Sequence, residues 1–246
     1  KKSKVMLFGA MALTAGLALA ACGSSQSSNA DKTYSYIFVN NPDTLDYITS
    51  TRDSTSSITT NLIDGLLEND QYGNLIPSMA ESWTVSKDGL TYTYKIRQGA
   101  KWYTSEGEEY ADVTAHDFVT GLKYAADKKA ENLYLVQDSI KGLADYVEGK
   151  SSDFGTVGVK AVDDYTLQYT LNQPETYWNS KTTASILSPV NEAFLKSKGD
   201  DFGSVTPSSI LSNGPYLFKS FTSKSLIELD KNPNYWDKDN VKIEKV

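Results

Sequence analysis

The sequence predicts a mixed α/β fold in a protein that is exported from the cell. Aromatic and aliphatic side chains alternate with a period of two in several short segments, which is typical of half-buried strands. Other segments place apolar side chains four residues apart, which is typical of amphipathic helices. The chain also begins with lysines followed by an apolar run, as a secretory signal peptide does.

The predicted signal peptide comprises residues 1–21. Its positive start contains three lysines, and residues 5–21 form an apolar run that ends in small side chains. This run is short for a transmembrane helix, which needs about 20 residues. We therefore expect residues 1–21 to direct export and to be removed.

Cys22 is the only cysteine, so the chain cannot form an intrachain disulfide. It ends the tetrapeptide Leu-Ala-Ala-Cys, which resembles the lipobox of bacterial lipoproteins. In such lipoproteins the chain is cut before the cysteine, and the thiol carries a diacylglyceryl anchor. We expect Cys22 to be the lipid attachment site. The alternative is ordinary secretion after cleavage behind Ala20, which would leave Cys22 as an unmodified thiol.

Residues 22–32 are expected to be the lipidated cysteine and a flexible linker. The linker is rich in serine and glycine, and it has almost no apolar side chain with which to fold. The folded part is therefore expected to begin near Thr33.

The charge balance argues against two classes of partner, nucleic acids and anionic lipid headgroups. Three of the 24 basic residues precede Cys22, so 21 basic residues face 31 acidic residues in the exported part, a formal charge of about −10. Nucleic acids and anionic headgroups are bound by clustered cations, so neither is expected as a partner.

The first elements of the folded part are expected to be a strand and a helix. Residues 33–39 alternate tyrosine and phenylalanine with smaller or polar residues, which predicts a half-buried strand. Residues 57–67 place Ile58, Leu62 and Leu66 four residues apart, which predicts an amphipathic helix.

Three hairpins follow from alternation around turn residues. The first joins residues 83–85 to 90–96 around the turn Ser-Lys-Asp-Gly. The others are expected to pair 157–162 with 165–171 and 216–221 with 226–229.

Two further helices lie between the hairpins. Residues 114–125 are expected to start with a capping pair formed by Thr114 and Asp117. Residues 138–147 are expected to be helical and to stop at Gly149.

No catalytic or metal-binding group is apparent in the sequence. His116 is the only histidine, and its place in the first turn of a capped helix favours a surface role over a catalytic one. Zinc sites need clusters of cysteine and histidine, which the sequence lacks. The carboxylate pairs at 108–109 and 163–164 lie in polar stretches and are expected to be solvated. A binding protein without cofactor or metal is therefore favoured over an enzyme.

Motifs along the folded part resemble, in order and spacing, the family 5 extracellular solute-binding proteins of ABC importers. This family includes oligopeptide, dipeptide and nickel receptors. The segments that carry the resemblance are DTLD (43–46), NLIDGLL (61–67), PSMAESW (77–83), KDGLTYTY (87–94), RQGAKW (97–102), VTAHDF (113–118), NGPY (213–216) and KNPNYWD (231–237).

The resemblance implies a periplasmic-binding-protein-like lobe of type II with an inserted α+β subdomain. The implied boundaries are 33–63 for the first part of the lobe, 64–187 for the subdomain and 188–246 for the second part of the lobe. The family closes two lobes around its ligand. The sequence reaches Val246 within the first lobe, so we expect the second lobe to be missing and peptide affinity to be weak or absent.

The resemblance also implies where the ligand contacts the first lobe. In the family an extended peptide pairs with short strand segments through its backbone. Counting from the DTLD motif to the NLIDGLL motif places the ligand segment at Thr51, Arg52 and Asp53. Arg52 and Asp53 depart from the smaller or apolar residues expected there. Tyr134 is a further candidate, with a core position as the alternative.

The implied function is capture of oligopeptides for import by an ABC transporter. The expected partners are oligopeptides, the permease subunits and, through the lipid anchor, the outer face of the bacterial cell membrane. A monomer is expected. The alternatives are a surface lipoprotein for adhesion or peptide sensing, and a family member that binds a nickel chelate or a sugar.

Overall fold

The structure is a computed structural model that describes residues 32–246, and residues 34–246 form one unit. The predicted signal peptide, Cys22 and almost all of the predicted linker lie outside the described residues. Among residues 32–246 no helix is both long and apolar enough to span a membrane.

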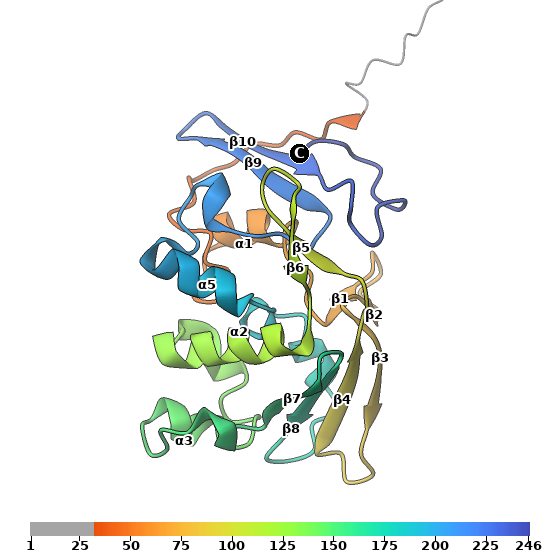
Figure 1. Cartoon of the computed structure of the whole chain (residues 1–246), viewed down its shortest axis with the longest axis vertical. Coiled ribbons are helices and arrows are strands. Elements are labelled where there is room, and N and C mark those ends of the chain that lie inside the picture. The colour runs from red at the N-terminus through yellow and green to blue at the C-terminus, as the bar shows by residue number, and fades with distance from the viewer. Residues whose placement is uncertain (1–31) are drawn as a thin grey trace, which may run out of the picture. The chain divides into compact units, whose positions relative to one another are not determined.

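The unit contains both helices and strands, in agreement with the mixed α/β prediction (Figure 1). The α-helices of the described part are α1 (Asp53–Thr59), α2 (Ala115–Lys128), α3 (Leu143–Val147), α4 (Trp178–Lys181) and α5 (Glu192–Lys198). The strands are β1 (Leu67–Asn69), β2 (Leu75–Pro77), β3 (Ala80–Val85), β4 (Thr91–Ile96), β5 (Lys101–Tyr103), β6 (Glu109–Asp112), β7 (Val159–Asp163), β8 (Thr166–Thr170), β9 (Tyr216–Thr222) and β10 (Leu226–Lys231).

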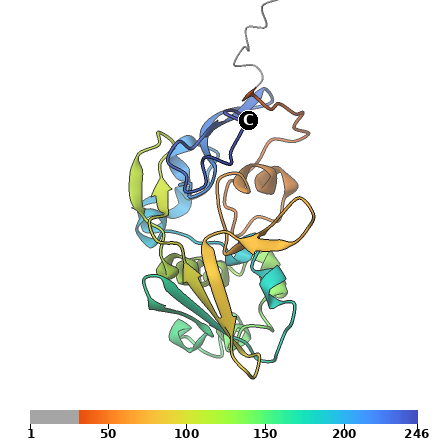
Figure 2. The ribbon, with the colours of Figure 1, turned by 90° about the vertical axis from the view of Figure 1, so that its right-hand side faces the viewer.

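The strands form antiparallel sheets. The largest has the order β3-β4-β8-β7, and the pairs β1-β2, β5-β6 and β9-β10 form ribbons. The ribbon of β9 and β10 lies at the opposite end of the unit from β7 and β8 (Figures 1 and 2). All three predicted hairpins are confirmed, as β3-β4, β7-β8 and β9-β10.

The buried face of the four-stranded sheet explains why its strands form. Tyr92, Tyr94 and Ile96 alternate along β4, and each is at most 5% exposed. Tyr94 packs edge to face against Tyr169 of β8, and Trp178 of α4 covers Tyr169 with ring centroids 5.3 Å apart. Full burial of one large apolar side chain contributes about 1.5 to 3 kcal/mol, so this aromatic group anchors the sheet.

The capping pair of α2 is confirmed. The backbone N–H of Thr114 donates to Asp117 Oδ2 at 2.9 Å, and Trp102 Nε1 donates to the same oxygen at 3.1 Å. The same side of α2 also lies against residues 188–190, where Val190 N donates to Asp117 O. A Cβ on Gly121 would stand 2.2 Å from the Ser188 carbonyl oxygen, so only glycine permits this approach.

The predicted strand over residues 33–39 is wrong. No strand forms over 34–39, and Ile37 and Val39 are 92% and 89% exposed. The alternating rings pack on one another instead, with Tyr36 centred 5.8 Å from Tyr34 and 6.0 Å from Phe38. A backbone hydrogen bond from Tyr34 N to Lys245 O does not continue into a ladder.

Two helix predictions were only partly correct. The helix predicted over 57–67 is α1, which begins at Asp53 and ends at Thr59, so Leu62 and Leu66 are buried outside it. The helix predicted over 138–147 is α3, which begins only at Leu143. Before it, Ile140 bridges to Leu171 beyond β8, and this sheet contact replaces the first helical turn.

Helix α1 ends early because the chain behind it is held by residues 212–214. Asn213 accepts a hydrogen bond from Asp64 N through Oδ1 and donates one to Asp64 O through Nδ2, at 2.9 and 3.1 Å. The backbone N–H groups of Asn213 and Gly214 both donate to Leu62 O. A Cβ on Gly214 would lie 2.7 Å from the Leu62 carbonyl carbon, so the two segments are in direct contact.

The side chain of Asp64 connects the contact between residues 62–64 and 212–214 to Tyr235 and Trp236, near the C-terminal end of the described chain. Tyr235 OH and Trp236 Nε1 donate to Asp64 Oδ2 at 2.8 and 3.0 Å, and the Arg97 guanidinium lies 3.7 Å from the centre of the Trp236 ring. Asp64 is 6% exposed, and burial raises its pKa to about 6, although the hydrogen bonds and Arg97 act to lower it.

Acidification is expected to stabilise the fold. Burial raises the pKa of Asp64 and of Asp117 to about 6, and burial together with the charges of Asp64 and Asp237 raises the pKa of Glu68 to about 7. The folded chain therefore holds more protons than the unfolded chain between about pH 4 and pH 7, and its stability falls as pH rises through that window. For Asp64 a rise from 3.8 to about 6 corresponds to about 3 kcal/mol.

Urea unfolding measured from pH 7.5 to pH 5 checks this prediction. Asp64→Asn should remove part of the pH dependence, whereas Asp239→Asn, at an exposed position, should leave it unchanged. A free energy of unfolding that stays level or falls on acidification would contradict the burial of these carboxyl groups.

Candidate functional site

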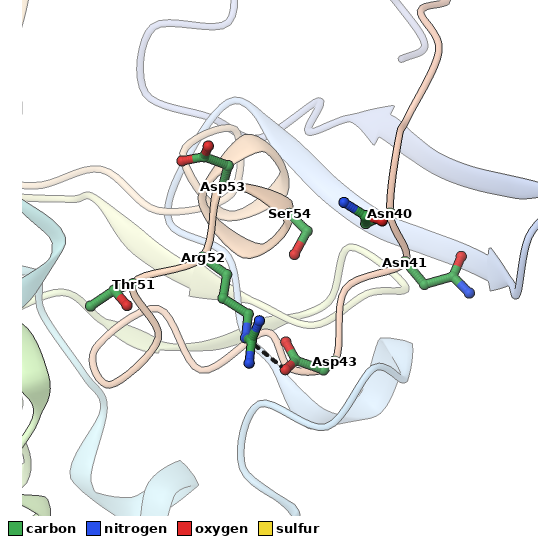
Figure 3. Close-up of a pocket in the computed structure, with 7 residues that line it drawn as sticks. All are labelled: Asn40, Asn41, Asp43, Thr51, Arg52, Asp53 and Ser54. Carbon is green, nitrogen blue, oxygen red and sulfur yellow. Dashed lines mark ion pairs between the residues drawn. The ribbon is translucent and has the colours of Figure 1, made fainter.

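The predicted ligand segment lies beside a cavity of about 640 Å³ (Figure 3). Volumes of this size are typical of sites for small ligands. The residues that line it are Asn40, Asn41, Asp43, Thr51, Arg52, Asp53 and Ser54. The structure therefore brings the three consecutive predicted residues to one cavity, with the preceding segment 40–43 as its other wall.

A buried carboxylate fixes the path of the chain into this site. Asp46 is 7% exposed, and its oxygens accept hydrogen bonds from the backbone N–H groups of Ile48 and Thr49. Tyr124 OH of α2 donates to Asp46 Oδ2 at 2.9 Å. A Cβ on Gly203, whose φ is +72°, would lie 2.4 Å from Asp46 N, so the turn is enclosed on that side as well.

Hydroxyl groups then position the segment that precedes α1. Ser50 Oγ donates to Thr55 Oγ1 at 3.0 Å, and Thr55 Oγ1 donates to Thr44 O at 2.8 Å. Arg52 has an extended backbone, with φ −85° and ψ 136°, and α1 starts directly after it. The segment thus runs extended up to the first turn of the helix.

The backbone of Thr51 is available to a ligand. Within residues 32–246 neither its N–H nor its C=O has a hydrogen-bond partner, whereas Arg52 O accepts from Thr55 N and Ser56 N. Exposed backbone groups on an extended segment can pair with an extended peptide. Thr51 therefore offers one donor and one acceptor in the wall of the cavity.

The charges of the cavity are only partly balanced. Arg52 Nε lies 2.9 Å from Asp43 Oδ2, and the two side chains point toward one another in Figure 3. Asp53 extends away from this pair and forms no ion pair with another described residue. Because both members of the Arg52–Asp43 pair are mostly exposed, the pair contributes little to stability.

The second predicted part of the site lies next to Thr51. Thr51 Oγ1 donates to Glu131 Oε2 at 3.3 Å, and Glu131 begins the 3-10 helix η2 (Glu131–Leu135) that contains Tyr134. Tyr134 is 75% exposed, so its alternative position in the core is wrong. It is not among the residues that line the cavity.

Sequence reasoning missed the opposite wall and Glu131. Residues 40–43 had the composition of a plain turn. They are held in place by Asn41, which donates to Ser223 Oγ and accepts from Lys224 N. Such partners lie more than 180 positions away and leave no local signal in the sequence. Glu131 likewise reaches Thr51 across 80 positions.

His116 lies at the surface, and the described part contains no cluster of metal ligands. His116 Nε2 lies 3.3 Å from Asp164 Oδ1 at the surface, in agreement with the predicted surface role. Among residues 32–246 no three histidine, cysteine or carboxylate side chains are grouped as metal ligands.

Comparisons with known proteins agree on one family. Residues 74–246 match the bacterial extracellular solute-binding proteins, family 5 (middle part). The chain is 65% identical over 245 residues to the oligopeptide-binding protein AliB of Streptococcus pneumoniae, and 63% identical over 248 residues to AliA of the same species. These alignments cover all of this chain but only 37% and 38% of the relatives, so the chain spans under two fifths of their length.

Solved structures also match most of the chain. A substrate-binding domain of an oligopeptide ABC transporter from Bacillus anthracis superposes with a TM-score of 0.79 at 34% identity, over 87% of this chain and 40% of that chain. OppA of Listeria monocytogenes bound to peptide superposes with a TM-score of 0.75 at 33% identity, over the same shares.

Two substitutions should show that the fold depends on the Asp46 carboxylate for its stability but not on the Arg52 side chain at the cavity surface. Asp46→Ala is expected to lower the free energy of unfolding by about 3 kcal/mol, because it leaves one buried donor and two partly buried donors without an acceptor. Arg52→Ala is expected to change it by less than about 1 kcal/mol, because the ion pair is exposed. Urea denaturation of both variants measures the contrast, and a large loss in the Arg52 variant would mean that the segment is structural.

Proposed function

The chain belongs to the family 5 bacterial extracellular solute-binding proteins, and from this premise we propose that it captures oligopeptides for import by an ABC transporter. The expected family and fold class, a lobe of the periplasmic-binding-protein type, are thereby confirmed. Several relatives are named oligopeptide-binding proteins. The family consists of binding proteins, which agrees with the sequence-based preference for binding over catalysis.

The open backbone of Thr51 carries this proposal. A peptide receptor that accepts many sequences gains affinity from main-chain hydrogen bonds rather than from side-chain contacts. Thr51 lines the cavity, and its N–H and C=O groups lack partners within the described part of the chain. Thr51, Arg52 and Asp53 thus form the proposed first-lobe contact for the peptide, with Tyr134 near its edge.

The proposal extends to where the protein works. Residues 1–21 direct export, and a diacylglyceryl group on Cys22 anchors the chain to the outer face of the cell membrane. Two acyl chains hold a protein to a bilayer far more firmly than one. The Ser-rich linker then keeps the receptor near the permease as a monomer, which raises the local concentration of captured peptide.

Titration with trialanine amide, followed by amide chemical shifts of the ¹⁵N-labelled chain, tests peptide capture. We expect binding with shift changes gathered at residues 50–54 and 131–134, because these segments form the proposed first-lobe contact. The same peptide with N-methylated backbone amides is the matched control. It should cause much smaller changes, since it lacks the donors needed for pairing.

Two results would contradict the proposal. One is an absence of shift changes with either peptide. The other is a set of changes located away from both segments, for example on β7 and β8.

A further inference from the structure

A second cavity, of about 610 Å³, lies along one edge of the four-stranded sheet. β7 is the outermost strand in the order β3-β4-β8-β7, and α2 packs against it (Figure 1). The cavity follows residues 155–161 along this edge, and His116 and Val119 of α2 contribute to its wall. We call this cavity the β7 groove. It shares no lining residue with the cavity beside Thr51, so it is a separate candidate site.

The backbone of β7 leaves hydrogen-bonding groups open to the groove. Thr170 N of β8 donates to Gly158 O at 2.8 Å, so this carbonyl points toward β8. Backbone groups point alternately to the two sides of a strand, so those of Val159 and Ala161 point away from β8. In agreement with this direction, Val159 N turns back to Val157 O. No other strand of the described part pairs with that side of β7, which leaves Val159 O and both groups of Ala161 for a further strand.

The face of the groove toward α2 is apolar. Val159 belongs to the hydrophobic core, and Ala161 and Val119 pack against that core. Side chains two positions apart lie on the same face of a strand. A strand added beside β7 would therefore place every second side chain on this apolar face.

The opposite face of the groove is basic. Lys160 lies between Val159 and Ala161 in β7, so it projects to the other face, where it is exposed. Lys141 joins it there, because a Cβ on Gly158, two positions before Lys160, would lie 3.1 Å from Lys141 Cβ. The alternate side chains of an added strand would thus meet two lysines.

The charge of these lysines is not balanced by the protein. Neither Lys141 nor Lys160 forms an ion pair or a side-chain hydrogen bond with another described residue. His116 differs from them, since its Nε2 lies 3.3 Å from Asp164 Oδ1. No carboxylate lines the groove, although the folded part of the chain has a large excess of acidic residues. An acidic ligand is therefore favoured over a basic one.

We propose that the β7 groove docks an extended, acidic segment of a partner protein, which adds to β7 as a further strand. Its main-chain groups pair with Val159 and Ala161, its apolar side chains face α2, and its acidic side chains face Lys141 and Lys160. A lysine on an edge strand discourages pairing with unrelated strands, so charge selects the partner. The inference is independent of the proposed function, because it concerns another site and another ligand.

Titration of the ¹⁵N-labelled chain with N-acetyl-Glu-Val-Glu-Val-Glu amide tests the docking. Shift changes should gather at residues 116–119 and 157–161. The peptide with lysine in place of each glutamate is the matched control, and it should bind at least fivefold more weakly. This preference should shrink as ionic strength rises, because it is electrostatic.

A double variant tests the two lysines. Lys141→Gln combined with Lys160→Gln should weaken binding of the acidic peptide at least fivefold and reduce its salt dependence. Lys87→Gln combined with Lys238→Gln is the matched control, because it makes the same change in net charge at exposed positions outside the groove lining. The control should bind the acidic peptide as the parent chain does.

N-methylated peptides test the pairing of main-chain groups. One version of the acidic peptide carries N-methyl groups on its valines and the other carries them on its glutamates. Alternate N–H groups of an extended strand face the same edge, so at least one version should bind tenfold more weakly than the parent peptide. Binding of both versions with the parent affinity would overturn the proposed strand addition.

Further outcomes would also overturn the inference. These are shift changes confined to residues 50–54, equal affinity for the acidic and basic peptides, and the same changes caused by sodium phosphate at equal ionic strength. Changes at residues 157–161 that grow with protein concentration, without peptide, would assign the groove to a second copy of this chain instead. The proposed function is judged separately, by the response of residues 50–54 to trialanine amide.

Discussion

The contact between residues 62–64 and residues 212–214 is the constraint on which the rest of the structure depends. The backbone that follows α1 accepts hydrogen bonds at Leu62 O from Asn213 N and Gly214 N. The Asn213 side chain bonds to both the N–H and the C=O of Asp64, as the backbone of a neighbouring strand would. Gly214 permits an approach that any Cβ would prevent. Because Asp64 is held in this contact, its carboxylate can receive Tyr235 and Trp236, and segments more than 170 positions apart become one core.

The acidic side chains of this lobe divide into two groups with different uses. Asp46, Asp64 and Asp117 are buried, and each accepts at least two hydrogen bonds, so they organise turns and a helix start. Burial raises the pKa of Asp64 and of Asp117. Asp53 and Glu131 are exposed near the cavity and lack a cation. Of the buried group, Asp46 holds the turn that leads into the site, and the exposed group places negative charge near the cavity. An extended segment with open backbone groups suits the pairing of main-chain groups with a peptide.

The parts of the fold that the sequence predicted correctly are those formed by neighbours in the chain. The three hairpins and the capping pair of α2 depend on residues a few positions apart, so alternation and turn residues were sufficient. The strand predicted over 33–39 failed because alternation indicates a strand only where a partner completes the ladder. The helix predicted over 57–67 ended at Thr59 because Asn213, about 150 positions away, holds the following backbone instead.

The candidate site also combines features that the sequence predicted with features that depend on residues distant in the chain. Motif order and spacing alone determined the family, and counting between motifs placed Thr51, Arg52 and Asp53, which line one cavity. The sequence also determined the acidic balance of the folded part and the absence of a histidine or cysteine cluster. Only the tertiary structure decided that Asp43 neutralises Arg52 and that Glu131 lies against Thr51. Both outcomes depend on side chains brought together by folding, and the energy of a charge depends on its neighbours in space, not on its neighbours in sequence.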